Sequence, residues 1–224
     1  AYGVSANYFE QDGIVGGAKS GFERATVRFN TNHQLKKWLT VGNTLGFTWL
    51  KRQFLPENNE FTTPLVRALN MDPVTPIRKA DGTYAYSLYA DTDIVNPLNA
   101  IEQTHDTWRS NRLVGSVFAE IRIMEGLSVR STYSLDATYA TQNTFYPLYD
   151  LSNIPELSDA PGGEKTETNS VAIGNNTWRN WQWENVLIYK KQFGLSHDFT
   201  FTAGTTALEN RHDYSGGANT NLPS

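Results

Sequence analysis

The stretch LSVRSTYSLDATY, residues 127–139, decides the fold of this chain because apolar and polar residues alternate along it. One parity holds Leu127, Val129, Tyr133, Leu135, Ala137 and Tyr139. The other holds Ser128, Arg130, Thr132, Ser134, Asp136 and Thr138. Successive side chains of a β-strand point to opposite faces. The stretch therefore predicts a strand with one apolar and one polar face.

The same period of two recurs elsewhere, so the sequence predicts seven strands and an all-β fold. The six other segments lie at about residues 1–8, 24–30, 39–49, 113–123, 181–189 and 198–207. Alternation of this kind is typical of antiparallel sheets, in which the two faces meet different environments. We expect one antiparallel sheet whose apolar face is continuous from strand to strand.

The connections between these segments fall into two size classes that alternate along the chain. The short ones are expected at residues 33–37, 124–126 and 190–196, and the long ones at 11–21, 51–110 and 140–177. In an up-and-down sheet, successive connections lie on opposite rims. Short turns on one rim and long loops on the other are typical of a transmembrane β-barrel.

The length of the alternation agrees with a membrane span. Segments 39–49 and 127–139 alternate for roughly 10 to 12 residues, which at a tilt near 45° rise about 23 to 28 Å. Such barrels have an apolar band of roughly 25 Å. Aromatic residues also stand near the strand ends, as an interfacial belt requires: Trp49, Tyr139 and Trp181 on the long-loop side and Tyr189 on the turn side.

The composition excludes several other classes of protein. The 224 residues are 39% hydrophobic, 12% aromatic and 19% charged, with no Cys and a net charge of -4. No apolar run approaches the roughly 20 residues of a transmembrane helix, and the aromatic content argues against disorder. Without Cys there is no disulfide or thiolate metal site, and the negative net charge does not indicate a basic surface for binding nucleic acid. A mean hydropathy of -0.49 suits a barrel with one wet face and polar loops.

The number of strands indicates a partial barrel. Complete bacterial barrels of this kind have an even number of strands, whereas this sequence predicts seven. The first residues already alternate, and the tract 215–224 is rich in turn residues and is expected to be a loop. We therefore expect residues 1–224 to be one part of a larger transmembrane β-barrel.

Several motifs resemble the SusC/RagA family of TonB-dependent outer-membrane transporters. They are Tyr8-Phe9-Glu10-Gln11-Asp12-Gly13-Ile14-Val15, Phe22-Glu23-Arg24, Arg28-Phe29-Asn30 and Lys37-Trp38-Leu39-Thr40-Val41-Gly42-Asn43, followed by Pro73-Val74, Asp81-Gly82-Thr83-Tyr84, Asn96-Pro97-Leu98 and Glu125-Gly126-Leu127. The resemblance is specific through about Leu135. Beyond that residue, only the strand pattern and the loop sizes agree with the family.

The resemblance implies a bacterial outer-membrane barrel of about 22 strands that is occluded by a plug. A surface lipoprotein of the SusD type would cap it, TonB would supply the energy, and the cargo would be an oligosaccharide or an oligopeptide. No plug or TonB box is recognisable in this sequence, so we expect those parts to lie outside residues 1–224. The aromatic loops suit both kinds of cargo and leave the choice open.

Charged residues on the polar parity are the first candidate site residues. They are Arg24, Arg28, Glu120, Arg122, Arg130, Asp136 and Glu184. An arginine facing lipid near the midplane costs about 2 to 4 kcal/mol, so these residues are expected to face the lumen. There they could contact the plug through charge-assisted hydrogen bonds. The alternative is that they pair with one another across neighbouring strands.

Aromatic residues of the expected loops are the second set, as candidate ligand contacts. They are Tyr84, Tyr86, Tyr89, Trp108, Phe145, Tyr146 and Tyr149. Aromatic faces stack on sugar rings and on peptide side chains, and the tyrosine hydroxyl adds a hydrogen bond. The alternative is packing within the loops or against the partner lipoprotein.

The sequence predicts no catalytic residue, no metal site and no cofactor. The four histidines are scattered, and Asp91-Thr92-Asp93 lacks the further acids and the glycine of an EF-hand loop. Two alternatives to a transporter stay open at this point. A soluble or surface β-sandwich that binds glycans would have strands of about 5 to 6 residues. An outer-membrane hydrolase barrel would need an even strand count and a Ser/His pair at one rim.

Overall fold

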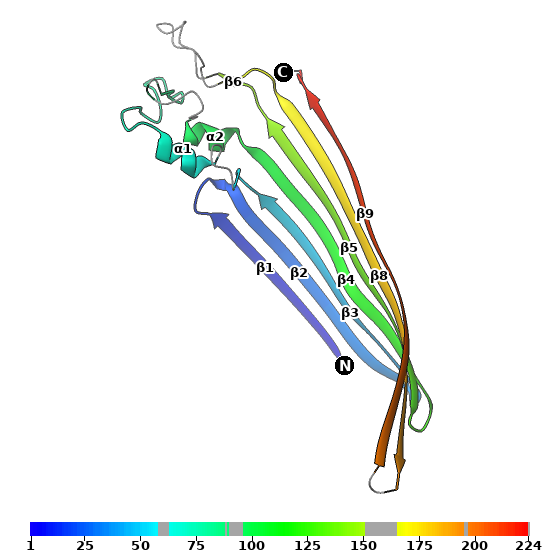
Figure 1. Ribbon diagram of the computed structural model, residues 1–224. Coiled ribbons are helices and arrows are strands. Elements are labelled where there is room, and N and C mark those ends of the chain that lie inside the picture. The colour runs from blue at the N-terminus through cyan, green and yellow to red at the C-terminus, as the bar shows by residue number, and fades with distance from the viewer. Residues whose placement is uncertain (58–62, 88, 90–95, 151–164, 195–196, 224) are drawn as a thin grey trace.

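The structure is a computed structural model that describes residues 1–57, 63–87, 89, 96–150, 165–194 and 197–223. Figure 1 shows one large, curved, antiparallel sheet with a small group of loop elements at one end. The sheet strands, in spatial order, are β1 (Tyr2–Gly13), β2 (Gly17–Lys36), β3 (Leu39–Gln53), β4 (His105–Met124), β5 (Leu127–Tyr146), β8 (Ser170–Phe193) and β9 (His197–Thr220). The seven predicted strands are confirmed.

The register joins the predicted apolar residues into one continuous face. Phe47 of β3 lies opposite Leu113 of β4, which lies opposite Ala137 of β5. Tyr133 of β5 lies opposite Trp183 of β8. Directly opposed residues of antiparallel strands share a face. We call this the apolar face and the other one the polar face.

Nothing in the described part of the chain covers the apolar face. Phe47 is 47% exposed, Val117 49% and Trp183 51%, and the buried apolar side chains are few: Leu55, Ala85, Ala137 and Ala140. An uncovered apolar surface of this size marks an interaction surface, and here it extends over a whole sheet. The strands of 12 to 24 residues also contradict the β-sandwich alternative, which requires strands about half as long. The apolar face therefore suits a lipid environment.

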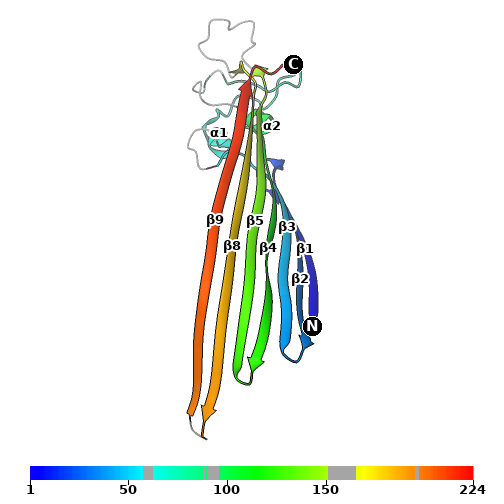
Figure 2. The ribbon, with the colours of Figure 1, turned by 90° about the vertical axis from the view of Figure 1, so that its right-hand side faces the viewer.

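The connections lie on two opposite rims of the sheet, as predicted. The turns at Lys37–Trp38 and Glu125–Gly126 and the facing ends of β8 and β9 are on one rim, and the ends that lead from β3 to β4 and from β5 to β8 are on the other (Figures 1 and 2). The long connection predicted at residues 11–21 is wrong. β1 and β2 join through residues 14–16 alone, and Gly16 and Gly17 have φ values of 90° and 51°, which a tight turn requires.

The strands extend farther toward the long-loop rim than the alternation indicated. β4 begins at His105 and β5 ends at Tyr146, so parts of the expected loops 51–110 and 140–177 are strand. The expected loop at 215–224 is also wrong, because β9 continues to Thr220. The pairing of β9 with β8 explains this continuation, because it runs to Thr220 opposite Ser170.

Beyond the aromatic residues on the long-loop side, the apolar face becomes charged. Lys51 lies two residues past Trp49 and pairs with Glu23 at 2.7 Å. On the last strands, Arg179 lies two residues past Trp181 and pairs with Asp213 at 2.8 Å, and at the level of Trp181 itself the indole donates to Glu209 at 3.0 Å. The sequence predicted charges only for the polar face. These pairs show that the wall continues past the apolar band into a polar environment.

The long-loop rim carries the remaining elements, α1 (Pro64–Asn70), α2 (Pro97–Gln103) and the two-stranded sheet of β6 (Tyr149–Asp150) and β7 (Lys165–Thr166). The Thr63 side chain caps α1, and the Asn96 side chain caps α2. Asn96 is 2% exposed, and its amide donates to the carbonyls of Ile77 and Ala85. Within the described residues, no helix is both long and apolar enough to cross a membrane.

Candidate functional site: an arginine-lined hollow on the polar face

The register brings all seven predicted charged residues to the polar face. Glu120 lies opposite Arg130, and Asp136 lies opposite Asn180. Arg24 and Arg28 follow the same parity on β2, opposite Leu50 and Gly46 of β3. Arg122 and Glu184 lie opposite Ser128 and Thr132. The structure thus gathers these residues on one face, and their contact with a plug stays a prediction.

Cross-strand pairing accounts for part of this set. Arg130 lies 3.9 Å from Glu120, and its guanidinium stands 3.8 Å from the centre of the Phe118 ring. Asp136 accepts two hydrogen bonds from Arg112, of 2.9 and 2.6 Å. Sequence reasoning missed Arg112 because it lies just before the segment 113–123 that alternates clearly. The register places it opposite Thr48 and Thr138.

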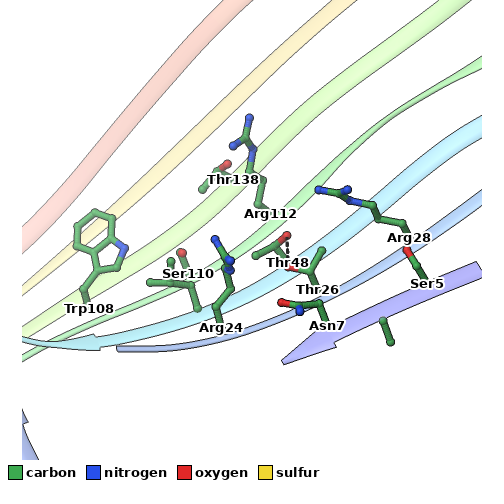
Figure 3. Close-up of a pocket in the computed structure, with 12 residues that line it drawn as sticks. Ser5, Asn7, Arg24, Thr26, Arg28, Thr48, Trp108, Ser110, Arg112 and Thr138 are labelled. Carbon is green, nitrogen blue, oxygen red and sulfur yellow. Dashed lines mark hydrogen bonds between the residues drawn. The ribbon is translucent and has the colours of Figure 1, made fainter. Parts of the chain in front are cut away.

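The polar face contains a hollow of about 590 Å³ that three arginines share (Figure 3). We call it the arginine hollow. It is lined by Ser5, Ala6, Asn7, Arg24, Thr26, Arg28, Thr48, Leu50, Trp108, Ser110, Arg112 and Thr138. Its lining includes no carboxylate. Arg24 and Arg28 have no acidic side chain within 4 Å among the described residues, whereas Arg112 is held by Asp136.

Small side chains on neighbouring strands create this space. The Thr26 and Thr48 hydroxyls lie 3.2 Å apart across β2 and β3, and Gly46 stands opposite Arg28. A Cβ at Gly46 would lie 3.7 Å from Cγ of Arg28, in ordinary van der Waals contact. Hydroxyl groups therefore line the base of the hollow, and the guanidinium groups project from the same face.

Trp108 forms one end of the hollow and begins a row of aromatic rings. Its ring centre lies 6.5 Å from that of Trp178, and the Trp178 ring stacks on His212 at 4.7 Å with an interplanar angle of 2°. The Asn176 side-chain oxygen lies 3.0 Å from Nε2 of His212. Sequence reasoning missed Trp178 and His212, because neither lies in a segment of clean alternation.

The structure corrects the loop assignment of several aromatic candidates. Trp108 belongs to β4, Phe145 and Tyr146 to β5, and Tyr149 to β6. Phe145 and Tyr146 are consecutive in a strand, so their side chains point to opposite faces. The cause is the extension of the strands beyond the apolar band. These residues stand on the wall or the rim instead of within a free loop.

Tyr146 and Tyr149 meet at a second hollow, of about 350 Å³, on the long-loop rim. It is lined by Pro56, Pro64, Arg67, Ala100, Gln103, Thr104, Tyr146, Pro147, Tyr149 and Thr166. The hollow combines aromatic rings, an arginine and an amide between α1, α2 and the small sheet. A polar ring or a peptide group fits this chemistry. Ligand contact by the two tyrosines stays a prediction.

Tyr84 packs within its own loop. The Arg78 guanidinium stands 3.9 Å from the centre of its ring and donates to its hydroxyl at 2.7 Å, and the hydroxyl donates to Glu102. Partial burial, and then the Glu102 carboxylate, raise the pKa of Tyr84. Tyr86 is half-buried, and Tyr89 is 76% exposed. Among these three tyrosines, Tyr89 is the one that presents most of its surface.

Lys19 fastens the long-loop rim to the sheet. Its Nζ donates to the carbonyls of Glu102 and Thr104, each at 3.1 Å, and lies 3.1 Å from Nδ1 of His105. It therefore joins the start of β2 to the end of α2 and the start of β4. The contacts satisfy carbonyls at a helix C-terminus, which otherwise have no partner within the helix.

We expect Lys19→Met to loosen this rim and to leave the sheet intact. Removing the three contacts exposes the segment between α1 and α2, so trypsin should cleave at Arg78 and Lys79 several-fold faster. The measurement is limited proteolysis followed by mass spectrometry of the fragments. Lys36→Met, on the opposite rim, is the control and should cleave at the original rate. Equal rates for the two variants would contradict the role given to Lys19.

The described residues contain no group of three or more His, Asp or Glu side chains that would hold a metal ion. The Asp91-Thr92-Asp93 tract lies outside the described residues. The polar face offers guanidinium donors, hydroxyls and aromatic rings.

Comparisons with known proteins agree with this architecture. The chain is 29% identical over 210 residues to the TonB-dependent receptor P26 of Formosa agariphila, covering 92% of this chain and 19% of the relative. It is 26% identical over 208 residues to the TonB-dependent receptor P3 of the same organism, covering 91% and 19%. The chain thus spans about a fifth of the length of these relatives. No protein-family model matches it.

The fold matches solved transporter structures. The chain superposes on a chain of the RagAB peptide transporter with a TM-score of 0.76 and 19% identity, covering all of this chain and 24% of that one. The RagAB importer in its open-open state gives a TM-score of 0.75 at 20% identity, with the same coverage. The resemblance to SusC/RagA-type TonB-dependent transporters and the barrel-segment fold are confirmed. The similar proteins are receptors and transporters, which agrees with the expectation that the chain is not an enzyme.

Proposed function

We propose that this chain is part of the barrel wall of a TonB-dependent importer of the SusC/RagA type in the bacterial outer membrane. Its role is to import nutrients that are too large for passive pores. The observation that carries the proposal is the two-faced sheet. An uncovered apolar face suits lipid, while the polar face opposite holds the arginine hollow and the aromatic row.

The same proposal includes parts of the protein that lie outside this chain. Further strands close the barrel, and a plug fills its lumen against the polar face. Glu184 is available for a contact with the plug, because no ion pair among the described residues occupies it. TonB acts through the parts outside residues 1–224. The similar receptors are about five times longer than this chain, which leaves room for these parts.

A surface lipoprotein of the SusD type is proposed as the partner at the long-loop rim. Three features of that rim support the assignment. The strands rise past the charged pairs of the apolar face, α1 and α2 form a platform fastened by Lys19, and the tyrosine-lined hollow opens among these elements. The cargo, an oligosaccharide or an oligopeptide, would enter between the platform and the lipoprotein.

The test is TonB-dependent uptake by the full-length receptor that contains this chain. The receptor gene is deleted and restored in its host, and growth is measured on single oligosaccharide and peptide sources. We expect deletion to abolish growth on at least one of them, and restoration to succeed only with an intact TonB system. Equal growth of the deleted and the restored strains on every source would contradict the proposed role in nutrient import. Failure of the receptor to fractionate with the outer membrane would contradict the barrel assignment.

A further inference from the structure

We propose that the arginine hollow is a binding site for an acidic oligosaccharide, held through the carboxylate of a uronic acid unit or an equivalent oxyanion. The inference rests on the proposed function and deepens it by naming a class of cargo. It concerns the face of the wall between β1 and β5, where Arg24, Arg28 and Arg112 gather (Figure 3).

The charge of the hollow is the first argument. Three guanidinium groups line it and no carboxylate does, and one of the three, Arg112, donates two hydrogen bonds to Asp136 outside the lining. Arg24 and Arg28 keep their donors available, since no acidic group lies within 4 Å of them among the described residues. Guanidinium groups bind planar oxyanions through paired, charge-assisted hydrogen bonds. An uncompensated cationic hollow therefore selects an anion.

The neutral groups of the hollow favour a sugar over a peptide. Five hydroxyl side chains line it, Ser5, Thr26, Thr48, Ser110 and Thr138, together with the amide of Asn7. These groups donate to and accept from the hydroxyls of a pyranose ring. The Trp108 ring at the end of the hollow offers a face for stacking on such a ring. Besides Trp108, the apolar residues of the lining are Leu50 and Ala6, and Ala6 lies opposite Val27 of the apolar face.

The size of the hollow agrees with a small oligosaccharide. Its volume of about 590 Å³ lies within the usual range of ligand pockets, roughly 300 to 1,000 Å³. The aromatic row continues from Trp108 on β4 through Trp178 on β8 to His212 on β9, across the wall. An oligosaccharide whose carboxylate binds Arg24 and Arg28 would be able to stack further sugar rings on these aromatic side chains.

The test measures binding by the purified full-length receptor in detergent. The probes are a tetramer of galacturonic acid and the same tetramer with its carboxyl groups reduced to alcohols. Binding is followed by calorimetry and by tryptophan fluorescence, at low salt and at 0.5 M NaCl. We expect the acidic tetramer to bind at least tenfold more tightly than the reduced one, and the difference to shrink at high salt.

The variant is the double substitution Arg24→Gln with Arg28→Gln, and Arg122→Gln is the matched control on the same face. Arg24 and Arg28 are exposed and unpaired with acids, so the double variant should fold. We expect it to lose at least tenfold in affinity for the acidic tetramer and none for the reduced one, whereas Arg122→Gln binds as the original protein does. A Trp108→Ala variant should weaken both tetramers.

Four results would overturn the inference. One is equal affinity for the acidic and reduced tetramers, and another is equal loss in the double variant and in Arg122→Gln. The third is that the double variant loosens the plug, seen as faster proteolysis of plug residues, while acidic binding is unchanged. That result would assign the arginines to the plug. TonB-dependent growth on a neutral source alone would leave the importer standing and reject the acidic cargo.

Discussion

An arginine in place of Leu45 should lower the free energy of unfolding of the receptor in lipid vesicles by about 2 to 4 kcal/mol, the cost of Arg on the lipid face near the midplane of a barrel. Leu45 is on the apolar face, where its neighbours across the sheet are Phe29 and Gly115, and it is 38% exposed. Its row continues through Leu135 to Trp181. The measurement is urea unfolding of the receptor in vesicles, followed by tryptophan fluorescence.

Thr44→Arg is the matched control for this prediction. Thr44 is the adjacent residue and therefore points to the polar face, opposite Asn30 and Ser116. An arginine there meets water and polar side chains, so we expect stability within about 0.5 kcal/mol of the original, as for ordinary surface changes. Equal destabilisation by the two arginines would show that the faces are assigned wrongly.

Gly126→Val should destabilise the β4–β5 hairpin strongly, for two additive reasons. Gly126 has φ of 77°, a conformation that costs a residue with a Cβ roughly 1 to 3 kcal/mol. A Cβ at this position would also lie 2.1 Å from the carbonyl oxygen of Lys190. That oxygen is backbone, so β8 itself would have to shift. We expect a loss of about 3 kcal/mol or failure to insert, measured by the yield of heat-modifiable barrel in outer-membrane fractions.

Gly194→Val separates the two reasons. Gly194 has φ of 64°, but among the described residues no atom beyond its chain neighbours lies within 4 Å of the position that its Cβ would take. Valine there carries the conformational cost without the collision, so the loss should be clearly smaller than at Gly126. If the two variants lose the same stability, the contact between the β4–β5 turn and Lys190 does not constrain the sheet.

The faces of the sheet follow from the sequence because lipid imposes a strict period of two. Leu127 to Tyr139 shows this period clearly, and the register confirms it on both neighbouring strands. Past Tyr139 both parities become polar, as in Thr141, Gln142 and Asn143. No alternation survives where both faces of a strand meet polar surroundings. The true ends of β4, β5, β8 and β9 therefore could not be predicted.

The arginine hollow was only partly predictable. Arg24 and Arg28 belong to a strand with clear parity, and the sequence placed them correctly on the polar face. Arg112 and Trp108 join them only through the pairing of β3 with β4, which connects segments separated by the long loop. The stacking of Trp178 on His212 likewise requires the register of β8 with β9. Single-strand patterns contain none of this cross-strand information.

The strands of the large sheet lie side by side in the order in which they occur along the chain, and this order affects which strand pairs form first. Each inner strand of the large sheet pairs with the strand before it and the strand after it along that sheet, and β1 and β9 each pair with one of them, so pairing follows the order of the chain. The hairpins β2–β3 and β4–β5 close through two residues each, whereas joining them encloses residues 54–104. Closure entropy rises by about 0.6 kcal/mol for each doubling of a flexible loop. We therefore expect these hairpins to form as separate units, and the pairing of β3 with β4 to be the slow step that unites them.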